Sequence, residues 1–150
     1  MGAQRQIGRV AVMRGNGGND LLIGSSMGDA LSGGDGNDTL LGKGGDDTLN
    51  GEDGNDGLSG FTGNDVIDGG RGFDRGFGGE GNDSLLGGNA ADTLIGGDGD
   101  DTLIGNDGTD TLVGGTGNND ASVGDVITDA TAVIDETFML DPLPGWVDQV

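Results

Sequence analysis

The sequence predicts an all-β repeat fold, and a fixed period of nine residues carries that prediction. Stepping by nine from Gly15 to Gly114, the first position of every unit is glycine, twelve times out of twelve. The sixth position is aspartate in the first eleven units, and the eighth is leucine or isoleucine in ten of the twelve. Because a fixed period of this length marks a stack of similar short units, we expect a solenoid.

Each unit reads Gly-x-x-Gly-x-Asp-x-Leu-x, and this pattern divides into a turn and a strand. Glycine recurs within the first six residues, where it tolerates the positive φ angles that a tight turn needs. The last three residues suit a short extended strand, in which alternate side chains point to opposite faces. We therefore expect the eighth residue to face a thin inner core and the ninth residue to face outward.

The repeat occupies residues 15–119 and leaves a segment without it at each end. Residues 1–14 include Ile7 and Val10 among several apolar side chains, which predicts an N-terminal capping strand. Residues 120–150 hold a second apolar group and predict a C-terminal cap. Both caps are expected because the end of a solenoid exposes core and unpaired strand edge.

The composition would by itself favour disorder, since 37 of the 150 residues are glycine and only 31% are hydrophobic. It also contains 27 acidic residues against 6 Lys and Arg, a formal net charge of −21. A chain this acidic repels phosphate backbones and anionic lipid surfaces, so we expect no nucleic-acid partner. It attracts cations instead, and 24 of the acids are aspartate, which is common in turns and calcium loops.

The nine-residue unit resembles the calcium-binding nonapeptide of the RTX (repeats-in-toxin) family over residues 15–119, about 70% of the chain. This resemblance implies a right-handed parallel β-roll of about twelve repeats, with two repeats in each coil, so that units 18 residues apart stack directly. It also implies that the sixth-position aspartates are the metal ligands. These residues are Asp20, Asp29, Asp38, Asp47, Asp56, Asp65, Asp74, Asp83, Asp92, Asp101 and Asp110.

Stacking of units 18 residues apart would place these aspartates in two columns. Neighbouring carboxylates in a column would be about 5 Å apart by strand spacing and would repel each other by roughly 0.8 kcal/mol even in water. Ca²⁺ takes 6–8 oxygen ligands, so an ion between two turns can use two carboxylates together with backbone carbonyls. Up to about ten such ions are expected, and Mg²⁺ suits the site less well because it demands a small octahedral shell.

Two other uses of the fold are alternatives to calcium binding. An ice-binding surface needs a flat rank of threonines, and the third position of the units shows no such rank. A structural or adhesive surface protein is the alternative function, with the roll as a spacer. Its assembly face would be the apolar residues at the ninth position of alternate units, and the same stripe would allow self-association. These residues are Ile23, Leu41, Phe77, Ile95 and Val113.

An enzyme is not expected, because the chain has no Cys and no His and its aspartates have no base partner. The sequence contains no apolar run of membrane-spanning length, so we expect no membrane span. The resemblance implies export by a type I secretion machinery, with a signal in residues 120–150. The roll would then fold on binding Ca²⁺ outside the cell, and the protein would be extracellular or on the cell surface.

Overall fold

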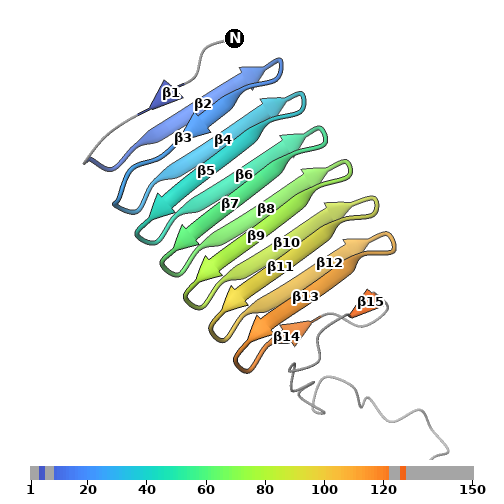
Figure 1. The fold of residues 1–150 in the computed structure, drawn as a ribbon. Coiled ribbons are helices and arrows are strands. Elements are labelled where there is room, and N and C mark those ends of the chain that lie inside the picture. The colour runs from blue at the N-terminus through green and yellow to red at the C-terminus, as the bar shows by residue number, and fades with distance from the viewer. Residues whose placement is uncertain (1–3, 6–8, 122–125, 128–150) are drawn as a thin grey trace, which may run out of the picture.

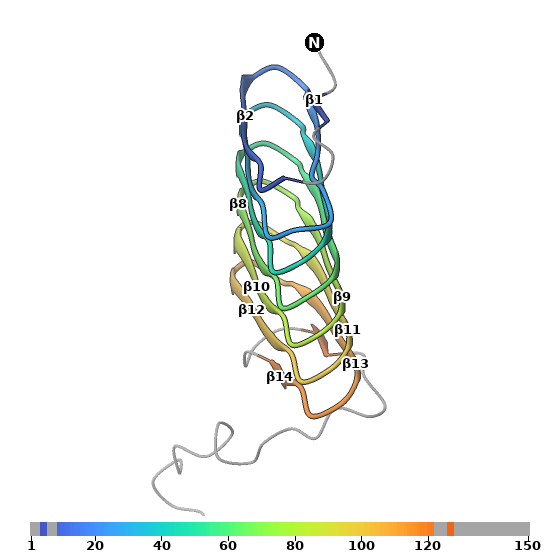
Figure 2. The ribbon, with the colours of Figure 1, turned by 90° about the vertical axis from the view of Figure 1, so that its left-hand side faces the viewer.

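The computed structural model of the protein is a solenoid of parallel strands with about six turns (Figure 1). It describes residues 4–5, 9–121 and 126–127, and these contain no helix. Successive strands alternate between two sheets, so two nine-residue units make one coil. Figure 2 shows the resulting flattened coils stacked along one axis. The predicted all-β roll with two repeats in each coil is confirmed.

The two sheets are named here by the numbers of their strands. The odd sheet contains, in order, β1 (Gln4–Arg5), β3 (Leu21–Ile23), β5 (Thr39–Gly44), β7 (Gly57–Thr62), β9 (Arg75–Glu80), β11 (Thr93–Asp98), β13 (Thr111–Thr116) and β15 (Val126–Ile127). The even sheet contains, in order, β2 (Val12–Gly17), β4 (Ala30–Asp35), β6 (Thr48–Asp53), β8 (Val66–Arg71), β10 (Ser84–Asn89), β12 (Thr102–Asp107) and β14 (Asp120–Ala121).

Strands pair in parallel with an offset of 18 residues along the repeat, as in the pairing of Leu40 with Leu58 and of Leu58 with Gly76. Along β5, Thr39 is exposed, Leu40 is buried and Leu41 is half-buried. The eighth position therefore faces inward and the ninth outward, as the alternation of a strand requires.

The sequence-based division of each unit into a six-residue turn and a three-residue strand was wrong. A full strand has six residues and runs from the seventh position of one unit to the third position of the next, as in β7. Pairing resumes after the first-position glycine, so Lys43 pairs with Phe61. The positive φ of the second position, 87° at Lys43, bends the chain without ending the ladder.

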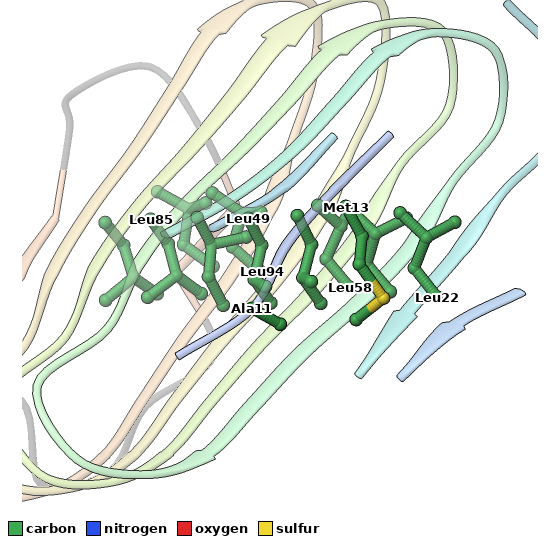
Figure 3. Close-up of a cluster of buried hydrophobic side chains, with 12 residues drawn as sticks. Ala11, Met13, Leu22, Leu49, Leu58, Leu85 and Leu94 are labelled. Carbon is green, nitrogen blue, oxygen red and sulfur yellow. The ribbon is translucent and has the colours of Figure 1, made fainter. Parts of the chain in front are cut away.

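The core is one row of side chains from each sheet, and Figure 3 shows the leucines of the two rows meeting between the sheets. Its buried members are Ala11, Met13, Leu22, Leu31, Leu40, Leu49, Leu58, Ile67, Leu85, Leu94, Leu103 and Leu112. Gly76 interrupts the row of the odd sheet. A methyl group there would lie 3.0 Å from Leu94 and 3.5 Å from Ile67, because these neighbours close around the glycine.

The described segments at the two ends add short strands to the outermost coils. β1 pairs with β3, and β14 and β15 pair with β12 and β13. Most of the predicted C-terminal cap and all of residues 128–150 lie outside the described residues. The described residues contain no helix that is long and apolar enough to cross a membrane.

Candidate metal centre

The sixth-position aspartates stand at the end of each turn, directly before the next strand begins. Asp20 is half-buried, and the other ten are at most 4% exposed. Asn119 occupies the same position in the last unit and is also buried. Burial of so many carboxylates costs free energy unless each oxygen has a hydrogen-bond donor or a cation as its partner. The contacts of each oxygen therefore show which oxygens are available to bind a metal ion.

One oxygen of each carboxylate holds neighbouring coils together. The backbone N–H of Asp38 donates to Oδ1 of Asp56 at 2.7 Å, and the N–H of Asp56 donates to Oδ1 of Asp74 at the same distance. The same bond recurs in both columns, and at the last step Oδ1 of Asn119 accepts from the N–H of Asp101. The structure therefore brings the predicted residues together in two columns with an 18-residue step.

The second oxygen, Oδ2, is buried without a hydrogen-bond partner along most of both columns. This group comprises Asp20, Asp38, Asp47, Asp56, Asp65, Asp74, Asp83, Asp92 and Asp101. A buried carboxylate oxygen without a hydrogen-bond donor costs free energy. Because these Oδ2 atoms recur in register along both columns, they provide a row of potential ligands for cations.

Carboxylate and carbonyl oxygens face the same small space beside the first-position glycines. A methyl group on Gly69 would lie 2.6 Å from Oδ2 of Asp74 and also 2.6 Å from the carbonyl oxygen of Gly87 in the next coil. A side chain at this position would displace both oxygens, which explains why the first position is glycine. Mixed carboxylate and carbonyl oxygens are the ligand type that Ca²⁺ prefers.

Within the described part of the chain, no three acidic side chains gather as a carboxylate-only metal site would require. A cation in the columns must therefore take its remaining ligands from the backbone or from water. This fits the sequence-based expectation of two carboxylates plus carbonyls for each ion, and it suits Ca²⁺ with its large and flexible shell.

Burial raises the pKa of eight of the column carboxyls, and the charge of neighbouring aspartates raises it further in most of these eight. The pKa of Asp47 rises to about 7, with desolvation as the largest cause. Desolvation also raises the pKa to about 6 in Asp65, Asp74, Asp92 and Asp101. The pKa values of Asp38, Asp56 and Asp83 are raised for the same reason.

Asp29 differs from the other column members, because both of its oxygens have hydrogen-bond donors. The backbone N–H of Ser25 donates to Oδ2 at 2.5 Å, and the Ser25 hydroxyl and the N–H of Ala11 donate to Oδ1. In this unit Met27 replaces the fourth-position glycine, and neither Ser25 nor Met27 has the positive φ found at these positions in the other units. In this turn, the N–H of Ser25 occupies the carboxylate oxygen, Oδ2, that is left for a cation in other units.

A second ladder of hydrogen bonds, which was not predicted from the sequence, runs along the fifth position on the exposed side of the columns. Oδ1 of Asn64 accepts the backbone N–H of Asn82, and Oδ1 of Asn82 accepts that of Asp100. Similar bonds join Asn19, Asn37, Asn55 and Phe73 in the other column. The signal was present, since this position is Asn or Asp in eight of twelve units. The ladder orders the turns beside the carboxylates.

The column that contains Asp38, Asp56 and Asp74 borders a pocket of about 560 Å³ that is open to solvent. Its lining includes Asp38, Asp56 and Asp74, with Phe73 and Arg75 beside them. Such an opening offers an entry path, which a buried ion site requires.

The comparisons with known proteins identify one family. A model of the RTX calcium-binding nonapeptide repeat, four copies long, matches residues 12–39, 23–58, 32–67, 41–75, 59–94, 68–103 and 86–121. Together these overlapping matches cover residues 12–121. Comparison with curated proteins and with solved structures finds no match.

Proposed function

Because the chain belongs to the RTX calcium-binding nonapeptide-repeat family, we propose that its β-roll folds by binding Ca²⁺ between stacked turns. The observation that carries this proposal is the register of buried Oδ2 atoms without partners in both columns. The proposed ligands are the sixth-position carboxylates other than that of Asp29, whose two oxygens already have donors, and carbonyl oxygens of the glycine-rich turns, such as that of Gly87 beside Asp74. The role is structural, and we propose no catalytic activity.

Calcium binding can supply the stability that the thin core lacks. A ligand at 100 times its dissociation constant stabilises the folded state by about 2.7 kcal/mol for each site. Several sites in two columns therefore add up to an amount comparable with the stability of an ordinary domain, about 5–15 kcal/mol. Each ion also neutralises carboxylates whose mutual repulsion opposes stacking.

Direct measurement of bound calcium tests the proposal. Equilibrium dialysis of the full chain with Ca²⁺ is expected to give several bound ions for each chain and up to about ten, the number of gaps in the columns. Mg²⁺ at the same concentration is the control and is expected to bind far less. Absence of bound Ca²⁺ at millimolar concentration would refute the proposal.

The hydrogen bonds from Ser25 and Ala11 to Asp29 predict that this carboxylate contributes less to calcium binding than the other column aspartates. Asp29→Asn is expected to leave the number of bound calcium ions unchanged, because both oxygens of Asp29 already have donors. Asp65→Asn is the matched change in the same column, and it is expected to lower that number because the amide nitrogen replaces an unpartnered oxygen. Native mass spectrometry counts the bound calcium ions in both variants. If both variants lose the same number of ions, Asp29 is a calcium ligand like the other column aspartates.

Protons are expected to compete with calcium for the column carboxylates. The folded pKa values of about 6 to 7 lie above the value of about 3.9 for an unfolded aspartate. Protonation therefore stabilises the metal-free roll, and this contribution is complete below about pH 4 and is lost as the pH rises through 6 to 7. Fewer ions should bind at pH 5.5 than at pH 7.5 at the same free calcium, as equilibrium dialysis can measure. Equal binding at both values would contradict the raised pKa values.

We also propose that the protein is exported by a type I machinery, carries its signal in residues 120–150, and folds outside the cell. Family membership supports this proposal, since a calcium-dependent fold can remain unfolded in a low-calcium cytoplasm and fold after export. A reporter fused to residues 120–150 should appear in the medium of cells that carry a type I system. A reporter retained both with and without that system would contradict the assignment.

A further inference from the structure

Two exposed phenylalanines line a groove in the outer face of the odd sheet. Phe61 of β7 is 44% exposed and Phe77 of β9 is 42% exposed, whereas the other apolar residues of the ninth-position row on this sheet are half-buried. The groove has a volume of about 370 Å³, which lies within the range of small-molecule sites. It presents two aromatic rings to solvent.

The floor of the groove is main chain, because the coils that follow Phe61 carry glycine at the equivalent position. Gly79 pairs with Phe61, and Gly97 pairs with Gly79 in the next coil. Both glycines line the groove. Since neither has a side chain, the hollow beside the rings stays open across two coils.

The groove also has an acidic wall. Glu80 ends β9 and Asp98 ends β11, and the two residues are exposed, pair in register and line the groove. The Thr116 hydroxyl donates to Oδ1 of Asp98 at 2.8 Å, but neither carboxylate forms an ion pair with a described residue. Like charges in register on adjacent strands repel each other, so a cation beside Glu80 and Asp98 would relieve that repulsion.

The wider charge distribution favours the same type of ligand. Lys43 and Arg75 belong to the same sheet but do not line the groove. Lys43 is on β5, two strands from Glu80, and Arg75 begins the strand that Glu80 ends. The net charge of the chain is −21, so its long-range field attracts cations toward the groove.

We propose that this groove binds a small organic cation with an alkylated ammonium group. The faces of Phe61 and Phe77 attract such a cation through cation–π interaction, and Glu80 and Asp98 supply the opposite charge. A metal ion suits the groove less well, because ring faces offer no oxygen ligands and Ca²⁺ takes 6–8 of them. An uncharged apolar ligand would leave the two carboxylates without a partner. The site is distinct from the calcium columns and requires only that the roll is folded.

NMR titration of the full chain with choline, in calcium and at physiological ionic strength, tests the proposal. The control ligand is the uncharged alcohol in which a carbon atom replaces the choline nitrogen. Choline is expected to shift the ring-proton signals of Phe61 and Phe77, and the alcohol is expected to shift them far less. Phe73 is an internal control, because it is 63% exposed and lies outside the groove.

Four variants separate the contributions of the rings and the acids. Phe77→Ala is expected to weaken choline binding about two- to fivefold, as for a cation–π contact at an exposed site, whereas Phe73→Ala is expected to leave it unchanged. Glu80→Gln is also expected to weaken binding. Glu52→Gln is its matched control, because it removes the same charge from an exposed residue of the even sheet.

Far-UV circular dichroism of the same samples shows whether the roll is folded, so loss of the site is distinguished from loss of the fold. Choline that shifts neither groove signal in the folded protein would overturn the proposal. Equal shifts with choline and the alcohol would overturn it in favour of an apolar groove that does not recognise charge. Equal losses of affinity in Glu80→Gln and Glu52→Gln would overturn it in favour of general attraction to an acidic surface.

Discussion

Removal of calcium is expected to convert the β-roll into an unfolded chain, which is the largest effect that we predict. Without the ion, the two columns hold closely spaced buried carboxylates, nine of which have an Oδ2 atom without a hydrogen-bond partner, while the core is a single row of side chains from each sheet. Far-UV circular dichroism and small-angle scattering are expected to show loss of β structure and an increased radius in chelator, and full recovery when Ca²⁺ is restored.

Magnesium and calcium should differ sharply in this experiment, because Mg²⁺ holds its water shell and demands octahedral geometry. Recovery in Mg²⁺ equal to that in Ca²⁺ would indicate simple charge screening by divalent ions. A chelated protein that keeps both its β signal and its compact radius would show that the fold does not depend on calcium.

A methyl group added at Gly60 is expected to destabilise the roll strongly, whereas one added at Gly57 on the same strand is expected to be harmless. In Gly60→Ala the new methyl would overlap Oδ2, Cγ and Cβ of Asp65. Overpacking of this kind costs about 1–3 kcal/mol, and displacement of Asp65 also weakens its bond from the N–H of Asp47 and removes a proposed calcium ligand. The calcium concentration at the folding midpoint should therefore rise.

Gly57→Ala is the matched control, because a methyl group there meets no atom within 4 Å and the backbone φ lies outside the left-handed region. The change is expected to be neutral or to stabilise the roll by about 0.4–1 kcal/mol through the unfolded chain. Calcium titration followed by circular dichroism measures the midpoint of both variants. If both midpoints move by the same amount, the first-position glycine is not required for close approach of the carboxylate.

The nine-residue period was enough to predict much of the fold before any coordinates were known. Stepping from Gly15 to Gly114 correctly identified the repeat, and the leucines at the eighth position, such as Leu40 and Leu58, are buried as expected. The columns of aspartates followed from an 18-residue stacking step, which the family resemblance implied and the pairing confirms. These features are predictable because one local conformation is repeated, so each residue type marks one environment.

Features that depend on the neighbouring coil were not predictable in this way. The length of the strands depends on pairing between coils, which continues past the positive φ of Lys43. The ladder through Asn64 and Asn82 joins residues that are 18 apart in the sequence. The recurrence of Asn and Asp at the fifth position was visible in the sequence, but the backbone N–H groups that these side chains bind were not.

The candidate site shows the same division between sequence and tertiary structure. By itself, the sequence determined which residues form the columns and that their charge calls for a cation. Only the tertiary structure decided that Oδ1 binds the adjacent coil, that Oδ2 of residues such as Asp65 stays without a donor, and that Ser25 satisfies Asp29. The physical reason is that a period specifies which side chains recur, whereas the partner of each oxygen depends on atoms of another coil and on local departures from the repeat.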